Sequence, residues 1–197
     1  MGAPRRPGAA RAAFLAGAAD LNSLPPEGRP EVAVAGRSNV GKSSLFNRVV
    51  GHRGLARVSK TPGRTQQINF FDVDQRVVLA DLPGYGFARV PLAEKARWRV
   101  LVEGYLTRRR VLRGVLVLVD VRRGLEPEDA QLLDFLAAHA LPARVVATKI
   151  DKIGRGARLA ALARLAASAP APIGFSSVTG EGTDAVWDAI NVWVAPR

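Results

Sequence analysis

The chain contains 197 residues, 48% of them hydrophobic, so it is long enough for one domain with a buried core and is not wholly disordered. Its 29 lysines and arginines against 17 aspartates and glutamates give a net charge of +12, which favours polyanionic partners such as nucleic acid or an acidic membrane surface. Cysteine is absent, which excludes disulfides, thiol catalysis and cysteine-bound zinc. No apolar stretch approaches the ~18 residues of a membrane span, so we expect neither a secreted nor an integral membrane protein.

Residues 1–28 are rich in Ala, Arg, Pro and Gly, and we expect a flexible extension that is partly docked on a domain covering residues 29–197. From residue 30 onward, short β-branched runs alternate with helical patterns, which predicts an α/β fold with helices on both faces of a mainly parallel sheet. The predicted strands cover residues 32–35, 67–73, 76–80, 115–120, 144–148 and 172–175. The predicted helices cover residues 42–50, 92–110, 128–140, 158–167 and 183–194.

Only two residues separate the second and third of these strands, so they must form an antiparallel hairpin. The expected sheet is therefore six-stranded and mostly parallel, with one antiparallel strand of the hairpin at its edge.

Residues 36–43 read GRSNVGKS and fit the pattern G-x-x-x-x-G-K-[ST] between a predicted strand and a predicted helix. Glycines let such a loop curl so that its N–H groups point inward, and the helix N-terminus adds a positive field, which together bind phosphate. In this type of loop Lys42 bridges the β- and γ-phosphates and the Ser43 hydroxyl holds Mg²⁺. The predicted phosphate-binding residues are Gly36, Arg37, Ser38, Asn39, Val40, Gly41, Lys42, Ser43 and Ser44.

Residues 81–84 read DLPG and follow the strand predicted at 76–80. A D-x-x-G match is weak by itself, and a plain Pro-Gly turn after a strand is the alternative. In nucleotide triphosphatases with the preceding loop, however, the Asp reaches Mg²⁺ through water and the Gly N–H senses the γ-phosphate. These roles would fall to Asp81 and Gly84, with Leu82 and Pro83 between them.

Residues 148–151 read TKID and follow another predicted strand. The Asp151 carboxylate can accept two hydrogen bonds from guanine N1–H and the 2-amino group, which adenine lacks, while the stem of Lys149 can lie over the purine. The peptide N–H groups of residues 175–177 (FSS) could meet guanine O6. Thr148, Lys149, Ile150 and Asp151 are the predicted base-binding residues, and an ATP-dependent kinase is disfavoured.

In their order these motifs are similar to those of the EngB family of bacterial GTPases. The matching stretches are GRSNVGKSSL (36–45), SKTPGRTQQINFF (59–71), DLPGYGFA (81–88), TKID (148–151) and FSS (175–177). Other GTPases share the general motifs but not the stretch TPGRTQ-x-x-NFF. The resemblance runs from about Phe14 to the C-terminus and implies a P-loop NTPase G domain.

The resemblance implies a cytoplasmic protein that binds GTP or GDP with Mg²⁺, hydrolyses GTP, and acts in assembly of the large ribosomal subunit through rRNA and ribosomal proteins. It also implies a role in cell division and septation; the alternative is a scaffold at the division site with indirect ribosome effects. We expect a monomer. The resemblance implies that Thr65 completes the Mg²⁺ coordination of Ser43 and Asp81. It adds these nucleotide-contacting residues: Gly63, Arg64, Thr65, Gln66, Gln67, Ser176, Ser177 and Val178.

Three positions bear on catalysis. Thr148 replaces the Asn of most GTPases, which removes an amide that would brace the phosphate loop. Tyr85 occupies the place of the Gln that orients the attacking water in Ras-like enzymes, so we expect slow intrinsic turnover. Asn39 matches the asparagine that ligates K⁺ in potassium-activated relatives of this group, although it could instead only shape the loop. The predicted catalytic residues are Asn39, Lys42, Thr65 and Gly84.

Positive charge is concentrated in two segments. Residues 32–71 contain seven basic residues and no acidic one, and residues 89–113 contain eight basic residues and two acidic ones. The alternative is a solvated basic face in an arginine-rich protein. Because the charge is so localised, we favour an RNA-binding face near the two switch segments.

Overall fold

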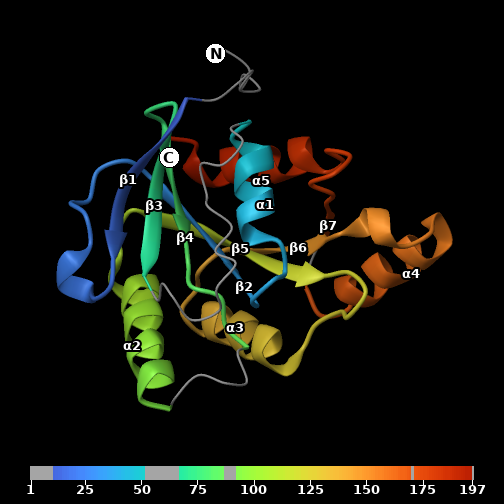
Figure 1. The fold of residues 1–197 in the computed structure, drawn as a ribbon, viewed down its shortest axis with the longest axis horizontal. Coiled ribbons are helices and arrows are strands. Elements are labelled where there is room, and N and C mark those ends of the chain that lie inside the picture. Colours follow the sequence, from blue (N-terminus) through green and yellow to red (C-terminus); the bar gives the residue numbers. More distant parts are fainter. Residues whose placement is uncertain (1–10, 52–66, 87–91, 170, 197) are drawn as a thin grey trace.

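The computed structural model describes residues 11–51, 67–86, 92–169 and 171–196 (Figure 1). Within these residues, one seven-stranded sheet has the order β1-β3-β4-β2-β5-β6-β7. The strands are β1 (Ala12–Ala18), β2 (Glu31–Gly36), β3 (Ile68–Val73), β4 (Val77–Asp81), β5 (Leu112–Asp120), β6 (Ala143–Thr148) and β7 (Ile173–Gly174). The helices are α1 (Lys42–Val49), α2 (Leu92–Arg108), α3 (Pro127–Ala138), α4 (Arg155–Ala166) and α5 (Thr183–Val194), with short 3-10 helices η1 (Leu21–Ser23) and η2 (Ile150–Lys152).

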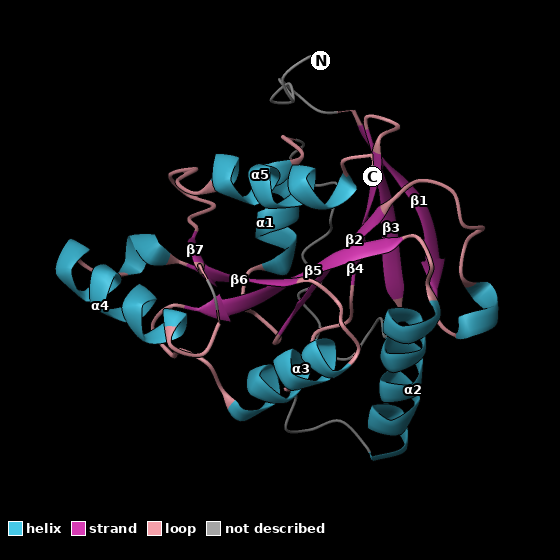
Figure 2. Cartoon of the chain, turned by 180° about the vertical axis from the view of Figure 1, so that it is seen from behind, coloured by secondary structure: helices cyan, strands magenta, loops and turns pink. Residues whose placement is uncertain are grey.

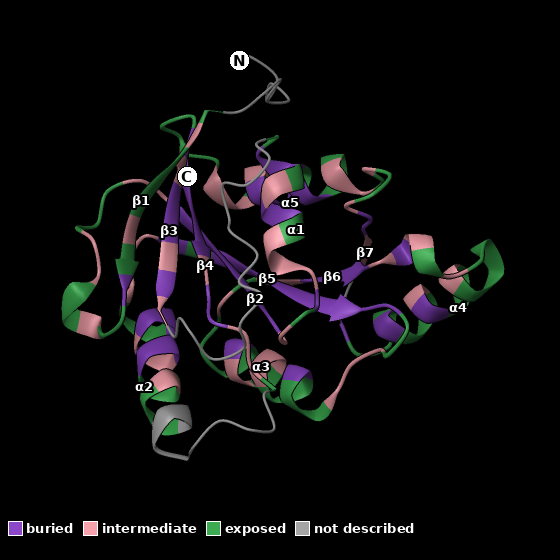
Figure 3. Ribbon diagram, in the orientation of Figure 1, coloured by how far each residue is buried: buried purple, intermediate pink, exposed green. Residues whose placement is uncertain are grey.

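Helices cover both faces of the sheet, as Figures 1 and 2 show from opposite sides. On one face α1 and α5 pack against the sheet, where Phe46 and Ile190 are fully buried. On the other face lie α2, α3 and α4, with Tyr105 and Leu136 buried against the strands. Figure 3 shows the central strands almost wholly buried. Strands buried on both faces explain the continuous apolar runs in the sequence of β2 and β5.

The mostly parallel sheet with an antiparallel hairpin is confirmed, but the predicted strand count was wrong. β3 pairs antiparallel with β4 as expected, and β1 adds a seventh strand by pairing antiparallel with β3. β1, not the hairpin, is therefore the outermost strand on that side. The sequence of Ala12–Ala18 does not alternate between polar and apolar residues, and only Ala18 is fully buried, so the residues by themselves do not indicate a strand. The predicted boundary between extension and domain at residue 29 stays a prediction.

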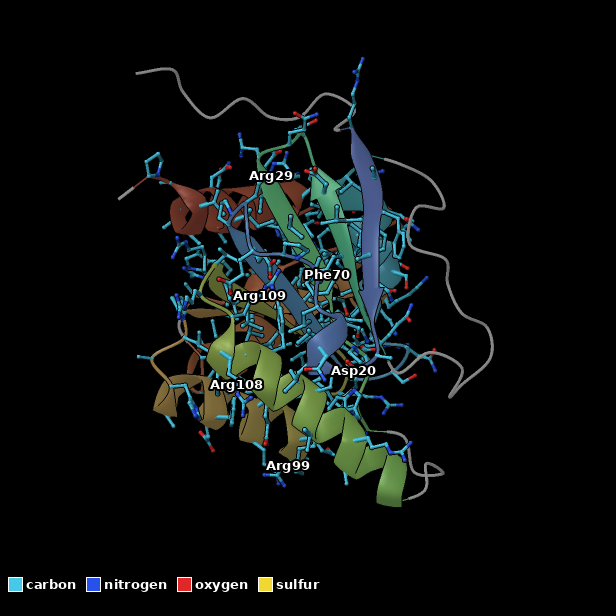
Figure 4. All side chains as sticks on the ribbon, turned by 90° about the vertical axis from the view of Figure 1, so that its left-hand side faces the viewer. Asp20, Arg29, Phe70, Arg99, Arg108 and Arg109 are labelled. Atoms are coloured by element: carbon cyan, nitrogen blue, oxygen red, sulfur yellow. The ribbon has the colours of Figure 1, made fainter. Side chains whose placement is uncertain are left out.

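Arg109 belongs to the interior of the fold and not to its basic surface. Its guanidinium donates to both carboxylate oxygens of Glu31, with a shortest distance of 2.6 Å, and the Tyr105 hydroxyl donates to the same carboxylate at 2.9 Å. The Arg109 side chain is only 5% exposed and its Cζ lies 5.7 Å from the centre of the Phe70 ring. Figure 4 shows Arg109 at the C-terminal end of α2, on the side towards Phe70, and Arg99 on the opposite side of the helix. Part of the basic run at residues 89–113 is thus structural.

Along the described part of the chain, none of the helices combines the length and the apolar character needed to cross a membrane.

Candidate functional site

The carboxyl ends of four neighbouring parallel strands bring the predicted motifs to one edge of the sheet. β2 ends at Gly36, β4 at Asp81, β5 at Asp120 and β6 at Thr148. In open α/β sheets, ligands bind in the crevice outside these strand ends. Motifs that are far apart in the sequence therefore form one candidate site.

The backbone of the loop between β2 and α1 explains the residue types of its motif. Gly36 has φ 154° and Gly41 has φ 113°, angles that L side chains rarely adopt. A Cβ on Gly36 would also lie 2.9 Å from the carbonyl oxygen of Leu118. Asn39 has φ 61°, in the left-handed region that Asn tolerates better than most residues. Since α1 begins at Lys42, the positive end of this helix lies at the loop.

Lys42 and Asp81 form the polar centre of the site. The Lys42 ammonium donates to the carbonyl oxygen of Gly36 at 3.0 Å and lies 3.4 Å from that of Arg37. Burial raises the pKa of Asp81 to about 6, although the attraction of Lys42 opposes this shift. Burial likewise lowers the pKa of Lys42, against the opposing attraction of Asp81. Both groups are thus held at a desolvation cost, which is typical of functional sites.

The donor set around Asp81 fits a hard divalent cation that also binds substrate phosphates. Asp81 Oδ1 is buried and has no hydrogen-bond partner in the described part of the chain. The described residues contain no group of three or more His, Cys, Asp or Glu side chains that could hold a metal ion by themselves. Mg²⁺ matches this pattern, because it typically uses one or two protein oxygens together with waters and phosphates.

Tyr85 is held at both ends. Its carbonyl oxygen accepts a hydrogen bond from the Ser38 N–H at 2.9 Å, and its hydroxyl donates to Asp129 Oδ1 at 2.7 Å. Burial, followed by the Asp129 carboxylate, raises the pKa of the Tyr85 hydroxyl far above its usual value. The hydroxyl is therefore neutral and directed at Asp129, so in this arrangement Tyr85 is no general base for a water.

Arg37 ties the phosphate loop to the first turn of α3. Its Nε lies 2.8 Å from Glu126 Oε2, and its Nη1 pairs with Glu128. A Cβ on Gly86 would lie 2.7 Å from the Arg37 Cζ, so the chain after Tyr85 passes directly over this guanidinium. The Arg37 side chain therefore binds protein carboxylates and not phosphate. The backbone of Arg37 still belongs to the loop, so the predicted phosphate contact stays a prediction for its backbone.

The predicted base-binding residues lie together on the other side of the site. The Ser176 hydroxyl donates to Asp151 Oδ1 at 2.7 Å, which lowers the pKa of Asp151. Ser176 is fully buried and its oxygen accepts the N–H groups of Val178 and Thr179 at 3.2 Å. These contacts fix one carboxylate oxygen of Asp151.

Lys149 links the base side to the phosphate side. Its ammonium donates to the Asn39 carbonyl oxygen at 2.7 Å and lies 3.0 Å from Asp120 Oδ2. Asp120 in turn pairs with Arg122 through both oxygens, and these contacts, with Arg122 first, lower the pKa of Asp120. The Lys149 side chain therefore reaches across the site, and two contacts hold its ammonium in place.

Thr148 differs from expectation, because it does brace the phosphate loop. Its hydroxyl oxygen lies 2.7 Å from the Val40 carbonyl oxygen and 3.2 Å from that of Val119. The side chain is buried at the end of β6, directly below the loop. A hydroxyl thus supplies the brace that we expected to be absent without the amide.

Some predicted residues fall elsewhere. Gly63, Arg64, Thr65 and Gln66 lie outside the described residues. The Gln67 side-chain amide donates to Asn69 Oδ1 at 2.8 Å and packs beside β1.

The sequence reasoning missed three acidic residues around the site: Asp120, Glu126 and Asp129. Asp120 could have been found as a charged residue at the end of an apolar strand. Glu126 and Asp129 form a capping box around Pro127 at the start of α3, a signal that was available in the sequence.

Comparison with known proteins agrees with this geometry. Residues 31–149 match the family described as "50S ribosome-binding GTPase". The "Probable GTP-binding protein EngB" of Nitrosococcus oceani is 45% identical over 190 residues, which cover 93% of this chain and 95% of that protein. Its counterpart from Citrifermentans bemidjiense is 48% identical over 176 residues, 87% of this chain and 82% of that protein.

Solved structures show the same fold. The crystal structure of a probable GTP-binding protein engB is similar with a TM-score of 0.70 and 25% identity, and covers 85% of this chain and 100% of that chain. Aquifex aeolicus Era bound to GDP.AlF4- has a TM-score of 0.65 at 21% identity, covering 85% of this chain and 57% of that one. The predicted G-domain fold is thereby confirmed, and the chain belongs to the EngB family of GTP-binding proteins and is a GTPase.

Proposed function

We propose that the residues gathered at the strand ends bind GTP and Mg²⁺ in the roles that the sequence predicts. The loop of Gly36–Ser44 would surround the phosphates and Asp151 would recognise guanine. Ser43, Asp81 and Thr65 would hold Mg²⁺, which neutralises phosphate charge when bound. The unpartnered, buried oxygen of Asp81 beside Lys42 is the observation that carries this assignment.

Hydrolysis in this site is proposed to be slow without a partner. Tyr85 stands directly after the DLPG motif, where Ras-like enzymes have the Gln that orients the attacking water, so the site lacks that side chain. Asn39 is exposed at the loop, where it could ligate K⁺ and offset the charge of the transition state. The K⁺ proposal requires faster GTP hydrolysis in K⁺ than in Na⁺ at equal ionic strength. Asn39→Ala should abolish that difference while GTP still binds, whereas equal rates in the two salts leave Asn39 with a loop-shaping role.

We further propose that the GTPase acts in the cytoplasm, as a monomer, in assembly of the large ribosomal subunit. In the same proposal it is needed for normal cell division and septation. The family description as a 50S ribosome-binding GTPase supports this proposal. So does an exposed basic surface at and after the end of α2, formed by Arg108, Arg110 and Arg113. In this chain it is a surface suited to phosphodiester oxygens of rRNA.

Cosedimentation with large ribosomal subunits across a salt series tests this proposal. Replacing Arg108 and Arg110 by Ala should weaken association and reduce its salt dependence by roughly one unit of slope for each phosphate that is no longer bound. Arg109 must be kept, because it is buried against Glu31.

Arg155→Ala with Arg164→Ala is the matched control. It removes the same charge from exposed positions on α4, at the opposite end of the sheet from α2 (Figures 1 and 2). Equal losses in both double variants would mean that only net charge matters. Association that is the same with GTP and GDP would favour the division-site scaffold instead.

A further inference from the structure

The structure joins three segments that are separate in the sequence through a single residue, Tyr85. Its backbone oxygen accepts the Ser38 N–H at 2.9 Å, and Arg37 and Tyr85 form a parallel β-bridge. Its hydroxyl reaches Asp129 in α3 at 2.7 Å. The DLPG segment is therefore attached on one side to the phosphate loop and on the other to α3.

The anchor at Asp129 is rigid. The residue is 1% exposed, and its Oδ2 accepts the backbone N–H of Glu126 at 3.0 Å in the capping box of α3. Glu126 is itself paired with Arg37 of the phosphate loop at 2.8 Å. Because both oxygens of Asp129 are used, the Tyr85 hydroxyl meets an acceptor that is already fixed in place.

In this arrangement the DLPG segment lies close to the phosphate loop. A single Cβ added to Gly84 would lie 2.9 Å from the Lys42 ammonium and 3.2 Å from the backbone nitrogen of Ser38. The proposed function places the γ-phosphate between Lys42 and the Gly84 N–H. A phosphoryl group is much larger than a methyl group, so GTP requires Gly84 and Tyr85 to withdraw from the loop. GDP has no γ-phosphate and is compatible with the observed contact.

We propose that Tyr85 is a positioning residue that favours binding of GDP over GTP, by holding the DLPG segment against the phosphate loop through its hydrogen bond to Asp129. The inference rests on the proposed location of the γ-phosphate. The hydrogen bond stabilises only the arrangement that admits GDP, because it is broken in the arrangement that admits GTP. It therefore raises the affinity for GDP relative to that for GTP. Tyr85 thus has a use other than the water-orienting role of Gln.

Tyr85→Phe tests the proposal, because it keeps the ring beside Trp98, at a centroid distance of 6.1 Å, and removes only the hydroxyl. The dissociation constants for GDP and for a non-hydrolysable GTP analogue would be measured by calorimetry with the full chain and Mg²⁺. We expect the ratio of GDP to analogue dissociation constants to rise about tenfold, the scale of one hydrogen bond to a charged group.

Tyr105→Phe is the matched control. It also removes a phenol hydroxyl that donates to a buried carboxylate, that of Glu31 at 2.9 Å, in a ring packed beside another aromatic ring. Tyr105 lies on α2 outside the nucleotide site, so its loss should lower the thermal stability without changing the nucleotide ratio.

Asp129→Ala is the second variant and removes the same bond from the other side. It should raise the ratio as Tyr85→Phe does, and the double variant should show no further rise. An unchanged ratio, or an equal loss of both affinities in Tyr85→Phe and Asp129→Ala, would overturn the proposal. The proposed function has a separate test, because Lys42→Ala should weaken the binding of both nucleotides if they bind at this site. Unchanged binding in Lys42→Ala, or no nucleotide binding by the unmodified protein, would contradict the proposed function.

Discussion

Asp151 is the residue on which the choice of base depends in the proposed site. Ser176 fixes one of its oxygens at 2.7 Å, so the carboxylate is already oriented before a ligand binds. Asp151→Asn exchanges an acceptor for a donor and should weaken GTP binding at least tenfold, the scale of a charged hydrogen bond. Xanthosine triphosphate, which carries a carbonyl in place of the 2-amino group, should bind this variant better than it binds the unmodified protein. Competition against a fluorescent nucleotide measures both effects.

Asp188→Asn is the control for this exchange, since it makes the same chemical change at an exposed position of α5. Equal competition of ATP and GTP for the unmodified protein would contradict the guanine assignment.

Asp81 makes the stability of the nucleotide-free protein depend on pH. Its pKa is raised to about 6 by burial, so the folded protein holds this proton more tightly than the unfolded chain does. The stabilisation is fully present below about pH 4, the unfolded pKa, and is lost as the pH rises to about 6. Asp81→Asn should therefore raise the free energy of unfolding at pH 7 and flatten its dependence between pH 4 and 6. Urea titrations at several pH values, without nucleotide or Mg²⁺, measure this; an unchanged slope would mean that Asp81 is ionised throughout.

At the scale of elements, Thr148 connects the end of β6 to the phosphate loop. Thr148→Val keeps the shape but leaves the Val40 carbonyl oxygen without this donor, a loss of about 1–3 kcal/mol for a buried group. We expect faster release of bound nucleotide from this variant, because the loop is no longer braced. Thr148→Ser retains the hydroxyl and should release nucleotide at nearly the original rate. Stopped-flow dissociation of a fluorescent GDP distinguishes them, and equal rates for Val and Ser would rule out the brace.

The sequence predicted most helices and strands because their signals are local. The β-branched runs of β2 and β6 and the apolar stripe of α5 identify those elements without reference to the rest of the chain. β1 was missed because it is a strand only through its pairing with β3, which is remote in the sequence. The motifs located the site, whereas the bond between Tyr85 and Asp129 depends on how α3 packs, which no spacing in the sequence encodes.

For the whole molecule, the buried pair of Glu31 and Arg109 joins the end of α2 to the start of β2. Arg109→Ala would leave the Glu31 carboxylate buried without its counter-charge, which typically costs about 3–5 kcal/mol. We expect a melting temperature lower by roughly 10 °C in a protein of this size. Arg108→Ala, at an exposed position next to it, should change the free energy of unfolding by less than about 0.5 kcal/mol. Calorimetric melting of both variants compares them directly, and similar melting temperatures would mean that the pair is not structurally important.

The position of β1 at the sheet edge has a consequence for how the chain folds during its synthesis. The neighbour of β1 in the sheet is β3. Where β1 begins and β3 ends, the Arg11 N–H donates to the Asp74 carboxylate, and these two residues are 63 positions apart in the sequence. At about 5–20 residues per second, the ribosome needs several seconds to supply that partner. Until then β1, which contains Phe14 and Leu15, has no β3 to pair with. In the described part of the chain, β1 is nevertheless the outermost strand of the finished sheet.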